Sequence, residues 1–138
     1  MTYAAFRSIG AYIPPKIMTN ADFEKIIDTS DEWITKRTGI KERRISEVDE
    51  ASSDLGSRAA EVAIQRAGIS KEEVDLVICA TVTPDFLCMP STACLIAAKV
   101  GLPPVMAFDV SAACTGFVYA VSIAKAFIES SIKKNVLI

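Results

Sequence analysis

The chain has 138 residues, which is enough for about one domain. Hydrophobic residues make up 51% of it and charged residues 23%, a balance that excludes intrinsic disorder. The net charge of −2 excludes nucleic-acid binding through a generally basic surface. Because the chain contains no histidine, it has neither an imidazole base nor an imidazole metal ligand.

The four cysteines are predicted to be free thiols. No two of them form a C-x-x-C pair, so no metal site is expected. The N-terminus lacks a basic region followed by an apolar run, and no stretch reaches the ~18 apolar residues of a membrane span. We therefore expect a reduced, cytoplasmic protein that is not bound to a membrane.

The first third of the chain combines turn and capping signals with short apolar runs. Proline pairs stop strands, and a hydroxyl residue followed by early acids starts a helix. The expected elements are a strand over 2–13 that stops at the prolines 14–15, a short helix capped around Thr19, a second short helix that ends before Gly39, and a surface loop over 41–50.

From residue 52 onward, helices and buried strands alternate, which predicts an α/β fold with a parallel sheet. The last strand has barely begun at Ile138, so the chain is expected to be a truncated piece. The expected elements are a helix over 52–67, a strand over 74–81, a loop over 82–90, a helix over 91–100, a buried strand over 105–110, a buried helix over 114–128 and a strand from 135. The inner face of the first helix is expected to carry Leu55, Ala59, Val62, Ala63 and Ala67.

Cys114 is the first candidate functional residue. A strand is predicted to run through a turn of small residues into a helix that starts at this cysteine, and a helix N-terminus favours the reactive thiolate. The alternative is a small apolar cysteine in the core, which is also what we expect for Cys79 and Cys94. Cys88 is expected to be a partly exposed thiol in a loop.

Trp33 and Arg37 are the second candidate, because a spacing of four residues puts both side chains on one face of a helix. An indole beside a guanidinium can hold an adenine ring and a phosphate. The alternative is a half-buried tryptophan with Arg37 in a surface ion pair. The apolar loop 83–90 is either a partner or ligand contact or a loop tucked over its own core.

With these residues in view, the sequence closely resembles the N-terminal part of the β-ketoacyl-acyl-carrier-protein synthase III family. The resemblance runs from end to end and covers under half of such an enzyme. Its motifs are residues 10–14 (GAYIP), 19–20, 28–34 (DTSDEWI), 37–40 (RTGI), 80–81, 90–91 and 113–117 (ACTGF).

The resemblance implies a thiolase-like layered αβαβα fold, of which residues 1–138 would be most of the first α/β half. Cys114 would take the acyl group from acetyl-CoA, and the thioester would then condense with malonyl-acyl-carrier-protein to start fatty acid synthesis. Trp33, Arg37 and Thr29 would contact CoA. Met89, and Phe86 in the same loop, would lie at the acyl pocket of a homodimer. The resemblance implies no permanently bound cofactor.

The chain departs from the family pattern because it lacks the catalytic histidine and asparagine, which the family places in its second half. Hydrogen bonds to the developing enolate oxygen would be missing, so the 138 residues alone are expected to be inactive. Two alternatives stay open. The chain could be a non-catalytic fragment that keeps only CoA contacts or the dimer face. It could also belong to a related condensing enzyme of the polyketide, alkylquinolone or hydroxymethylglutaryl-CoA type.

Overall fold

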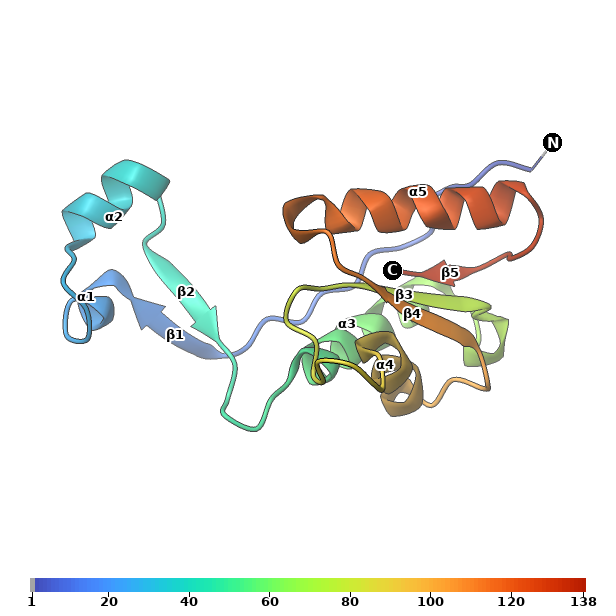
Figure 1. Cartoon of the computed structure of the whole chain (residues 1–138), viewed down its shortest axis with the longest axis horizontal. Coiled ribbons are helices and arrows are strands. Elements are labelled where there is room, and N and C mark those ends of the chain that lie inside the picture. The colour runs from blue at the N-terminus through green and yellow to red at the C-terminus, as the bar shows by residue number, and fades with distance from the viewer. Residues whose placement is uncertain (1) are drawn as a thin grey trace. The chain divides into compact units, whose positions relative to one another are not determined.

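The computed structural model describes residues 2–138, which divide into two compact units. One unit is formed by residues 13–50, and the other by residues up to Tyr12 together with residues 51–138. In Figure 1 the elements of the smaller unit are coloured blue to cyan.

The unit of residues 13–50 is built on a two-stranded antiparallel sheet. Its elements are β1 (Lys16–Thr19), α1 (Asn20–Phe23), α2 (Asp31–Thr38) and β2 (Glu42–Ile45). Lys16 pairs with Ile45 and Thr19 with Glu42. The prediction of a loop over 41–50 is therefore wrong, and β1 was not predicted at all. Both strands are largely exposed and carry charged side chains, whereas the ladder between them is made by the main chain.

The two short helices of this unit begin as predicted. The Asp22 carboxylate accepts the Thr19 N–H at 3.0 Å in a capping box, and the Ser30 hydroxyl accepts the Trp33 N–H at 3.1 Å. Gly39 ends α2 with φ 73°, a left-handed conformation that suits glycine.

A buried side chain connects the helices of this unit with its strands. Asn20 is 2% exposed, and its amide donates to the Asp31 carboxylate and to the Ile40 carbonyl, both at 2.8 Å. The Arg43 guanidinium donates to the Asn20 carbonyl at 2.6 Å. Both N–H groups and the carbonyl oxygen of the Asn20 amide are thus used, and the start of α2 is fixed relative to β2.

The larger unit is an α/β layer around a three-stranded parallel sheet with the order β4-β3-β5, so the predicted fold class is confirmed. Its elements are α3 (Ser52–Ala67), the 3₁₀ turn η1 (Lys71–Glu73), β3 (Leu76–Ala80), α4 (Thr92–Val100), β4 (Met106–Val110), the 3₁₀ turn η2 (Ala113–Thr115), α5 (Gly116–Glu129) and β5 (Val136–Leu137). These elements match the predicted order.

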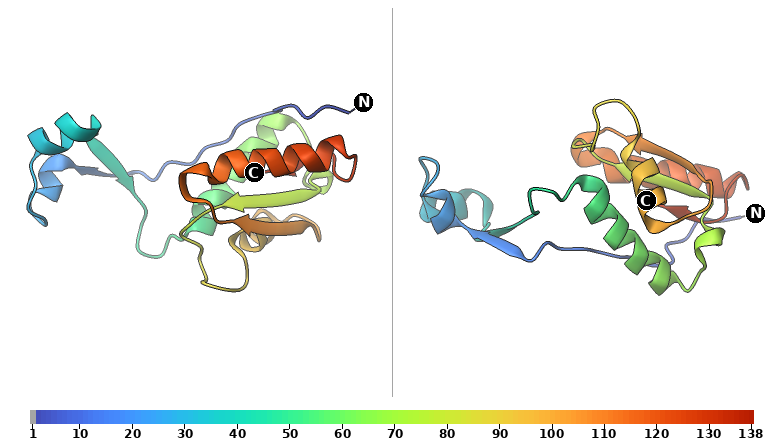
Figure 2. Two further views of the ribbon diagram at one scale, coloured as in Figure 1. Left: turned by 45° about the horizontal axis from the view of Figure 1, so that its top comes forward. Right: turned by 90° about the horizontal axis from the view of Figure 1, so that it is seen from below.

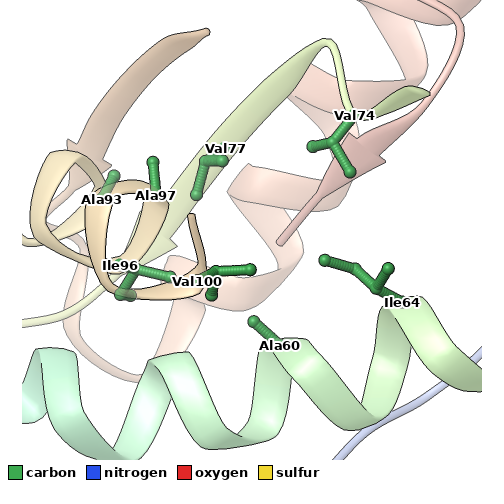
Figure 3. Close-up of a cluster of buried hydrophobic side chains, with 8 residues drawn as sticks. All are labelled: Ala60, Ile64, Val74, Val77, Ala93, Ile96, Ala97 and Val100. Carbon is green, nitrogen blue, oxygen red and sulfur yellow. The ribbon is translucent and has the colours of Figure 1, made fainter. Parts of the chain in front are cut away.

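Alternate residues of β3 serve two separate cores. Leu76 and Ile78 face α5, whereas Val77 faces α3 and α4 on the other side of the sheet. Figures 1 and 2 show α5 on one side of the sheet and the other two helices on the opposite side. Figure 3 shows the second cluster, formed by Ala60, Ile64, Val74, Val77, Ala93, Ile96, Ala97 and Val100.

The buried face of α3 differs from the predicted one. The buried residues are Ser53, Ser57, Ala60 and Ile64, and the residues expected on the inner face are only half-buried. Hydropathy alone misplaced this face because two buried serines lie on it. Their hydroxyl groups are hydrogen-bonded, which removes the cost of burying them.

The predicted strand over 2–13 is also wrong, because this segment has no regular secondary structure. Instead of pairing in a ladder, it follows α3. The Ser8 hydroxyl donates to the Ala63 carbonyl at 2.7 Å, and the Arg66 guanidinium donates to the Ile9 carbonyl at 2.8 Å. A Cβ on Gly10 would lie 2.1 Å from the Ala59 carbonyl oxygen, so only glycine permits this close approach.

Two further expectations about burial are corrected. The strand β4 is only partly buried because it lies at the edge of the described sheet. The helix α5 buries one stripe, but Phe117, Val118 and Tyr119 are more than half exposed. Within residues 2–138, no helix is long and apolar enough to cross a membrane.

Candidate active site

Cys114 lies in a sharp connection between β4 and α5. Ala112 has φ −147° and ψ 29°, and Ala113 has φ 43°, which is a left-handed conformation for a residue with a side chain. Such a conformation costs about 1–2 kcal/mol and persists only where the surroundings impose it. Cys114, the next residue, is exposed.

Close packing at the end of β3 holds this connection in place. Gly116 is buried, and a Cβ there would lie 3.3 Å from the Ala80 Cβ. The Thr81 N–H donates to the Val110 carbonyl at 3.1 Å, and the Thr115 hydroxyl donates to the Ala112 carbonyl at 2.8 Å. These contacts explain how the strained turn is maintained.

The structure corrects one detail of the Cys114 prediction. The α-helix begins at Gly116, so the cysteine lies in the preceding 3₁₀ turn and not in the helix itself. Within residues 2–138, Cys114 is exposed and is not part of either core cluster. A cavity of about 770 Å³ opens beside the turn, lined by Cys114 and Phe117 together with parts of β3, α3 and the N-terminal segment.

The other cysteines differ sharply in their surroundings. Cys79 is half-buried, and burial, followed by the charges of Asp109 and Asp85, raises the pKa of its thiol to about 11. It is therefore an inert thiol, as predicted. Cys88 is exposed, also as predicted. Cys94 is exposed, contrary to prediction. The buried face of α4 is formed by Thr92, Ala93, Ile96, Ala97 and Val100, and Cys94 is not on that face.

Trp33 and Arg37 meet on α2 as their spacing predicted. The Arg37 guanidinium carbon lies 5.4 Å from the centre of the indole ring, and Trp33 is 57% exposed. Among the residues that the structure describes, Arg37 forms no salt bridge, so the surface ion pair is not the arrangement found. Thr29 is half-buried next to the cap of the same helix. These three residues belong to the unit of residues 13–50, whereas Cys114 belongs to the other unit.

The apolar loop after β3 is exposed and does not fold back over the core. Phe86 is 53% exposed, Leu87 102% and Met89 81%. The centre of the loop is fixed by Asp85, whose carboxylate accepts the Ser53 N–H at 2.9 Å. Of the alternatives drawn from sequence, the contact surface is the one that this exposure favours.

Sequence reasoning missed the carboxylates that support the site. Asp109 lies within β4, shortly before Cys114, and accepts two backbone N–H groups of α4. Its position at the carboxyl end of a parallel strand was the available signal. Within the described part of the chain, no group of three or more cysteine or acidic residues could hold a metal ion.

Comparison with known proteins identifies what these features resemble. A family model described as 3-oxoacyl-[acyl-carrier-protein] synthase III matches residues 108–138, which include the Cys114 turn. The chain is 86% identical over 138 residues to the β-ketoacyl-[acyl-carrier-protein] synthase III of Aliarcobacter butzleri. It is similar from end to end to the N-terminal part of that enzyme. The sequence resemblance is thus confirmed, and the chain spans 41% of that protein's length.

Other relatives agree. The synthase III of Sulfurovum is 67% identical over 136 residues, which are 99% of this chain and 40% of that protein. The crystal structure of 3-oxoacyl-[acyl-carrier-protein] synthase III from Aquifex aeolicus is 51% identical, with a TM-score of 0.91 over 99% of this chain and 43% of that one. The fold is therefore the α/β layer of the thiolase-like synthases.

Proposed function

We propose that the chain is the N-terminal half-domain of a β-ketoacyl-[acyl-carrier-protein] synthase III that starts type II fatty acid synthesis. One observation carries this proposal. A cysteine on a strained, exposed turn lies within a sequence that is 86% identical, end to end, to a relative with that name. Residues 1–138 would form most of the first half of the thiolase-like fold. Residues that correspond to the rest of the relative would form the second half.

The proposed reaction has two stages. The Cys114 thiol gives up its proton, and the thiolate attacks the carbonyl carbon of acetyl-CoA. The C–S bond to CoA breaks, and CoA leaves as a thiolate that takes up a proton from solvent. Malonyl-acyl-carrier-protein then loses carbon dioxide, and the resulting carbanion attacks the thioester. The product is a 3-ketoacyl thioester on the carrier protein, and the Cys114 thiolate is restored.

Condensation needs hydrogen-bond donors to the thioester carbonyl and the enolate oxygen, each often worth several kcal/mol. The resemblance to the synthase III family implies that a histidine and an asparagine of the second half supply these donors; the 138 residues themselves contain no histidine. The role of this chain is therefore to hold the nucleophile. Its exposed thiol beside an apolar cavity suits the transfer of a short acyl group.

Trp33, Arg37 and Thr29 are proposed to bind the CoA ester. The exposed indole offers a flat face for the adenine ring, and the guanidinium above it offers donors to phosphate. CoA is here a substrate, and no permanently bound cofactor is part of the proposal.

Phe86 and Met89 are proposed to meet a second copy of the chain at the acyl pocket of a homodimer, since both are exposed apolar side chains on one loop. A cytoplasmic location belongs to the same proposal. All four cysteines are free thiols, which suits a reducing compartment.

A related condensing enzyme is the second candidate function. The structure of a priming β-ketosynthase from the R1128 polyketide pathway is 37% identical, with a TM-score of 0.88 over 94% of this chain. The two candidates differ in the acyl donor and in the consumer of the product. Rates with acetyl-CoA and with longer acyl-CoA esters therefore separate them.

The test is intact-mass analysis of the full-length protein after incubation with acetyl-CoA. We expect an acetyl-sized gain on the peptide that contains Cys114, which is lost in Cys114→Ser. The matched control is Cys88→Ser, which removes another exposed thiol and should acylate normally. Acylation that persists in Cys114→Ser would refute the assignment of the nucleophile.

A further inference from the structure

Asp109 joins the strand that leads to Cys114 to the beginning of α4. Its two carboxylate oxygens accept the N–H groups of Thr92 and Ala93, each at 2.8 Å. The Ser91 hydroxyl accepts the next N–H, from Cys94, at 3.3 Å. The first three amides of α4 are thus satisfied, two of them by a carboxylate that lies 17 and 16 residues away in the sequence.

Asp85 joins the apolar loop 83–90 to the beginning of α3. Its carboxylate accepts the Ser53 N–H at 2.9 Å and the Ser53 hydroxyl at 2.5 Å. Its own N–H donates to the Thr92 hydroxyl at 3.4 Å. Since Ser53 and Thr92 are fully buried, the centre of the loop is attached to rigid positions on two helices.

Thr92 is the residue that both aspartates contact, Asp109 through its carboxylate and Asp85 through its backbone N–H. Its N–H bonds to Asp109, and its hydroxyl accepts the N–H of Asp85. Lys99 completes the network, because its ammonium group donates to the Ser53 hydroxyl and to the Asp54 carboxylate, both at 2.6 Å. Asp109 bonds to α4 and Asp85 to α3, so both carboxylates lie on the side of the sheet that these two helices cover.

We propose that Asp109 and Asp85 are positioning residues for acyl transfer. The Asp109 carboxylate fixes the segment before the Cys114 turn against α4, and the Asp85 carboxylate fixes the apolar loop against Ser53 of α3. The inference rests on the proposed function. Asp109 precedes the strained turn on the same chain segment, so its anchorage to α4 limits movement of the thiol. Asp85 holds the loop between Val82 and Phe86, which are both exposed.

Asp109 should therefore affect the rate of acylation, whereas Asp85 should affect the preference between short and long acyl chains. A displaced thiol reacts more slowly with every acyl group, since misplacement of about 1 Å can cost ~100-fold in rate. A displaced loop changes which acyl chains fit, because the loop supplies the apolar surface that a longer chain contacts. Neither residue touches the reacting atoms, so neither is a catalytic residue.

The chain provides a matched control in Asp75. Its carboxylate also accepts two backbone N–H groups, from Lys134 at 2.8 Å and Asn135 at 3.1 Å. However, Asp75 lies just before β3, whereas Cys114 follows the carboxyl end of the parallel strand β4. An Asp75→Asn change thus removes the charge of a carboxylate that holds two N–H groups at the opposite end of the sheet, both of them on its Oδ2 atom.

The experiment compares single-turnover acylation in the full-length protein with acetyl-CoA and hexanoyl-CoA. Asp109→Asn leaves one N–H of α4 without its acceptor and should slow both reactions equally, by about tenfold or more. Asp85→Asn should change the ratio of the two rates by about fivefold or more. Asp75→Asn should keep both rates within about twofold of the wild type, even where its melting temperature falls.

A second readout does not depend on acyl-CoA chemistry. Alkylation of Cys114 by iodoacetamide should slow in Asp109→Asn, with Cys88 in the same sample as the internal reference. Thr92→Val removes the hydroxyl that accepts the Asp85 N–H, at nearly constant volume, and should alter the hexanoyl-to-acetyl ratio in the same direction as Asp85→Asn. This variant keeps the test informative if an aspartate variant fails to fold.

The outcomes separate the two proposals. A wild-type protein that takes no acyl group contradicts the proposed function. A wild-type protein that acylates, together with unchanged rates in folded Asp109→Asn and Asp85→Asn, overturns the positioning roles. Equal losses in Asp75→Asn and Asp109→Asn also overturn them, because the effect is then one of general stability.

Discussion

The Arg37 guanidinium carbon lies 5.4 Å from the centre of the Trp33 ring, one turn further along α2. This distance is within the range of a cation–π contact, which is worth about 0.5–1 kcal/mol at an exposed site. The contact holds a long, flexible side chain against a flat aromatic face. A ligand with both a ring and a phosphate group therefore meets two preformed contacts on one helix.

Arg37→Ala should weaken the binding of CoA by about tenfold at low salt, because a charge-assisted bond to phosphate is lost. The difference from the wild type should shrink at high salt, which screens this interaction. Titration calorimetry of the full-length protein with CoA at two salt concentrations measures both effects. Lys36→Ala removes the neighbouring exposed cation of α2 and serves as the matched control. Equal affinity losses in both variants would contradict a specific role for Arg37.

The cysteines should separate into two classes on alkylation at about pH 8. Cys88, Cys94 and Cys114 are exposed and should react with iodoacetamide within the same period. Cys79 should stay unmodified, because it is half-buried and its thiol has a pKa of about 11, which leaves little thiolate at that pH. Peptide mass mapping gives the result, and unfolding in denaturant should expose all four. Rapid labelling of Cys79 in the folded protein would refute its inert position.

Gly10→Ala should destabilise the larger unit by about 1–3 kcal/mol, the usual cost of overpacking. The added Cβ would lie 2.1 Å from the Ala59 carbonyl oxygen and 2.5 Å from the Ala63 nitrogen, and both atoms belong to the backbone of α3. Gly68→Ala is the comparison, because nothing lies within 4 Å of its Cβ and the cost is only that of φ 63°, about 1 kcal/mol. Denaturant unfolding measures the two. A smaller loss for Gly10→Ala than for Gly68→Ala would mean that the N-terminal segment does not pack on α3 as described.

Stability should fall as the pH drops below about 4, partly through Asp75. The N–H groups of Asn135 and Lys134 lower the pKa of its carboxyl group in the folded protein. A carboxyl group with a depressed folded pKa contributes stability above its unfolded pKa, and that contribution is lost as the pH falls through the folded value. Asp75→Asn should therefore flatten the dependence between about pH 5 and pH 2, as followed by urea unfolding midpoints. An unchanged slope would exclude this group as a contributor.

Local signals in the sequence predicted the elements that depend on local chemistry. The helix from Ser52 to Ala67 was predicted with correct ends, because a glycine in a left-handed conformation follows it. The antiparallel pairing of β1 with β2 was not predicted. Both strands are charged and exposed, and the residues that pair are far apart in the sequence. Partners that are distant in the sequence also explain why the segment before Tyr12 was wrongly predicted as a strand. Its partners lie on α3, more than fifty residues away.

The candidate site divides in the same way. The pattern of small residues around Cys114 was sufficient to single out the turn, and the spacing of Trp33 and Arg37 was sufficient to place them together. Sequence alone could not reveal the left-handed Ala113 or the bonds of Asp109 to α4. Backbone strain is imposed by the packing around it, and a carboxylate meets the N–H groups that donate to it only after the strand and helix have assembled.

The pairing of Lys16 with Ile45 has a consequence for how this chain can vary. Paired strands bring these two residues to neighbouring positions, so the chain leaves and returns at almost the same place. The polar network around Asn20 is also confined to this excursion. Residues 13–50 thus form a self-contained cassette. Insertions, deletions and substitutions that change ligand preference can therefore occur within residues 13–50. They need not change the register of the parallel sheet or the residues of its two cores.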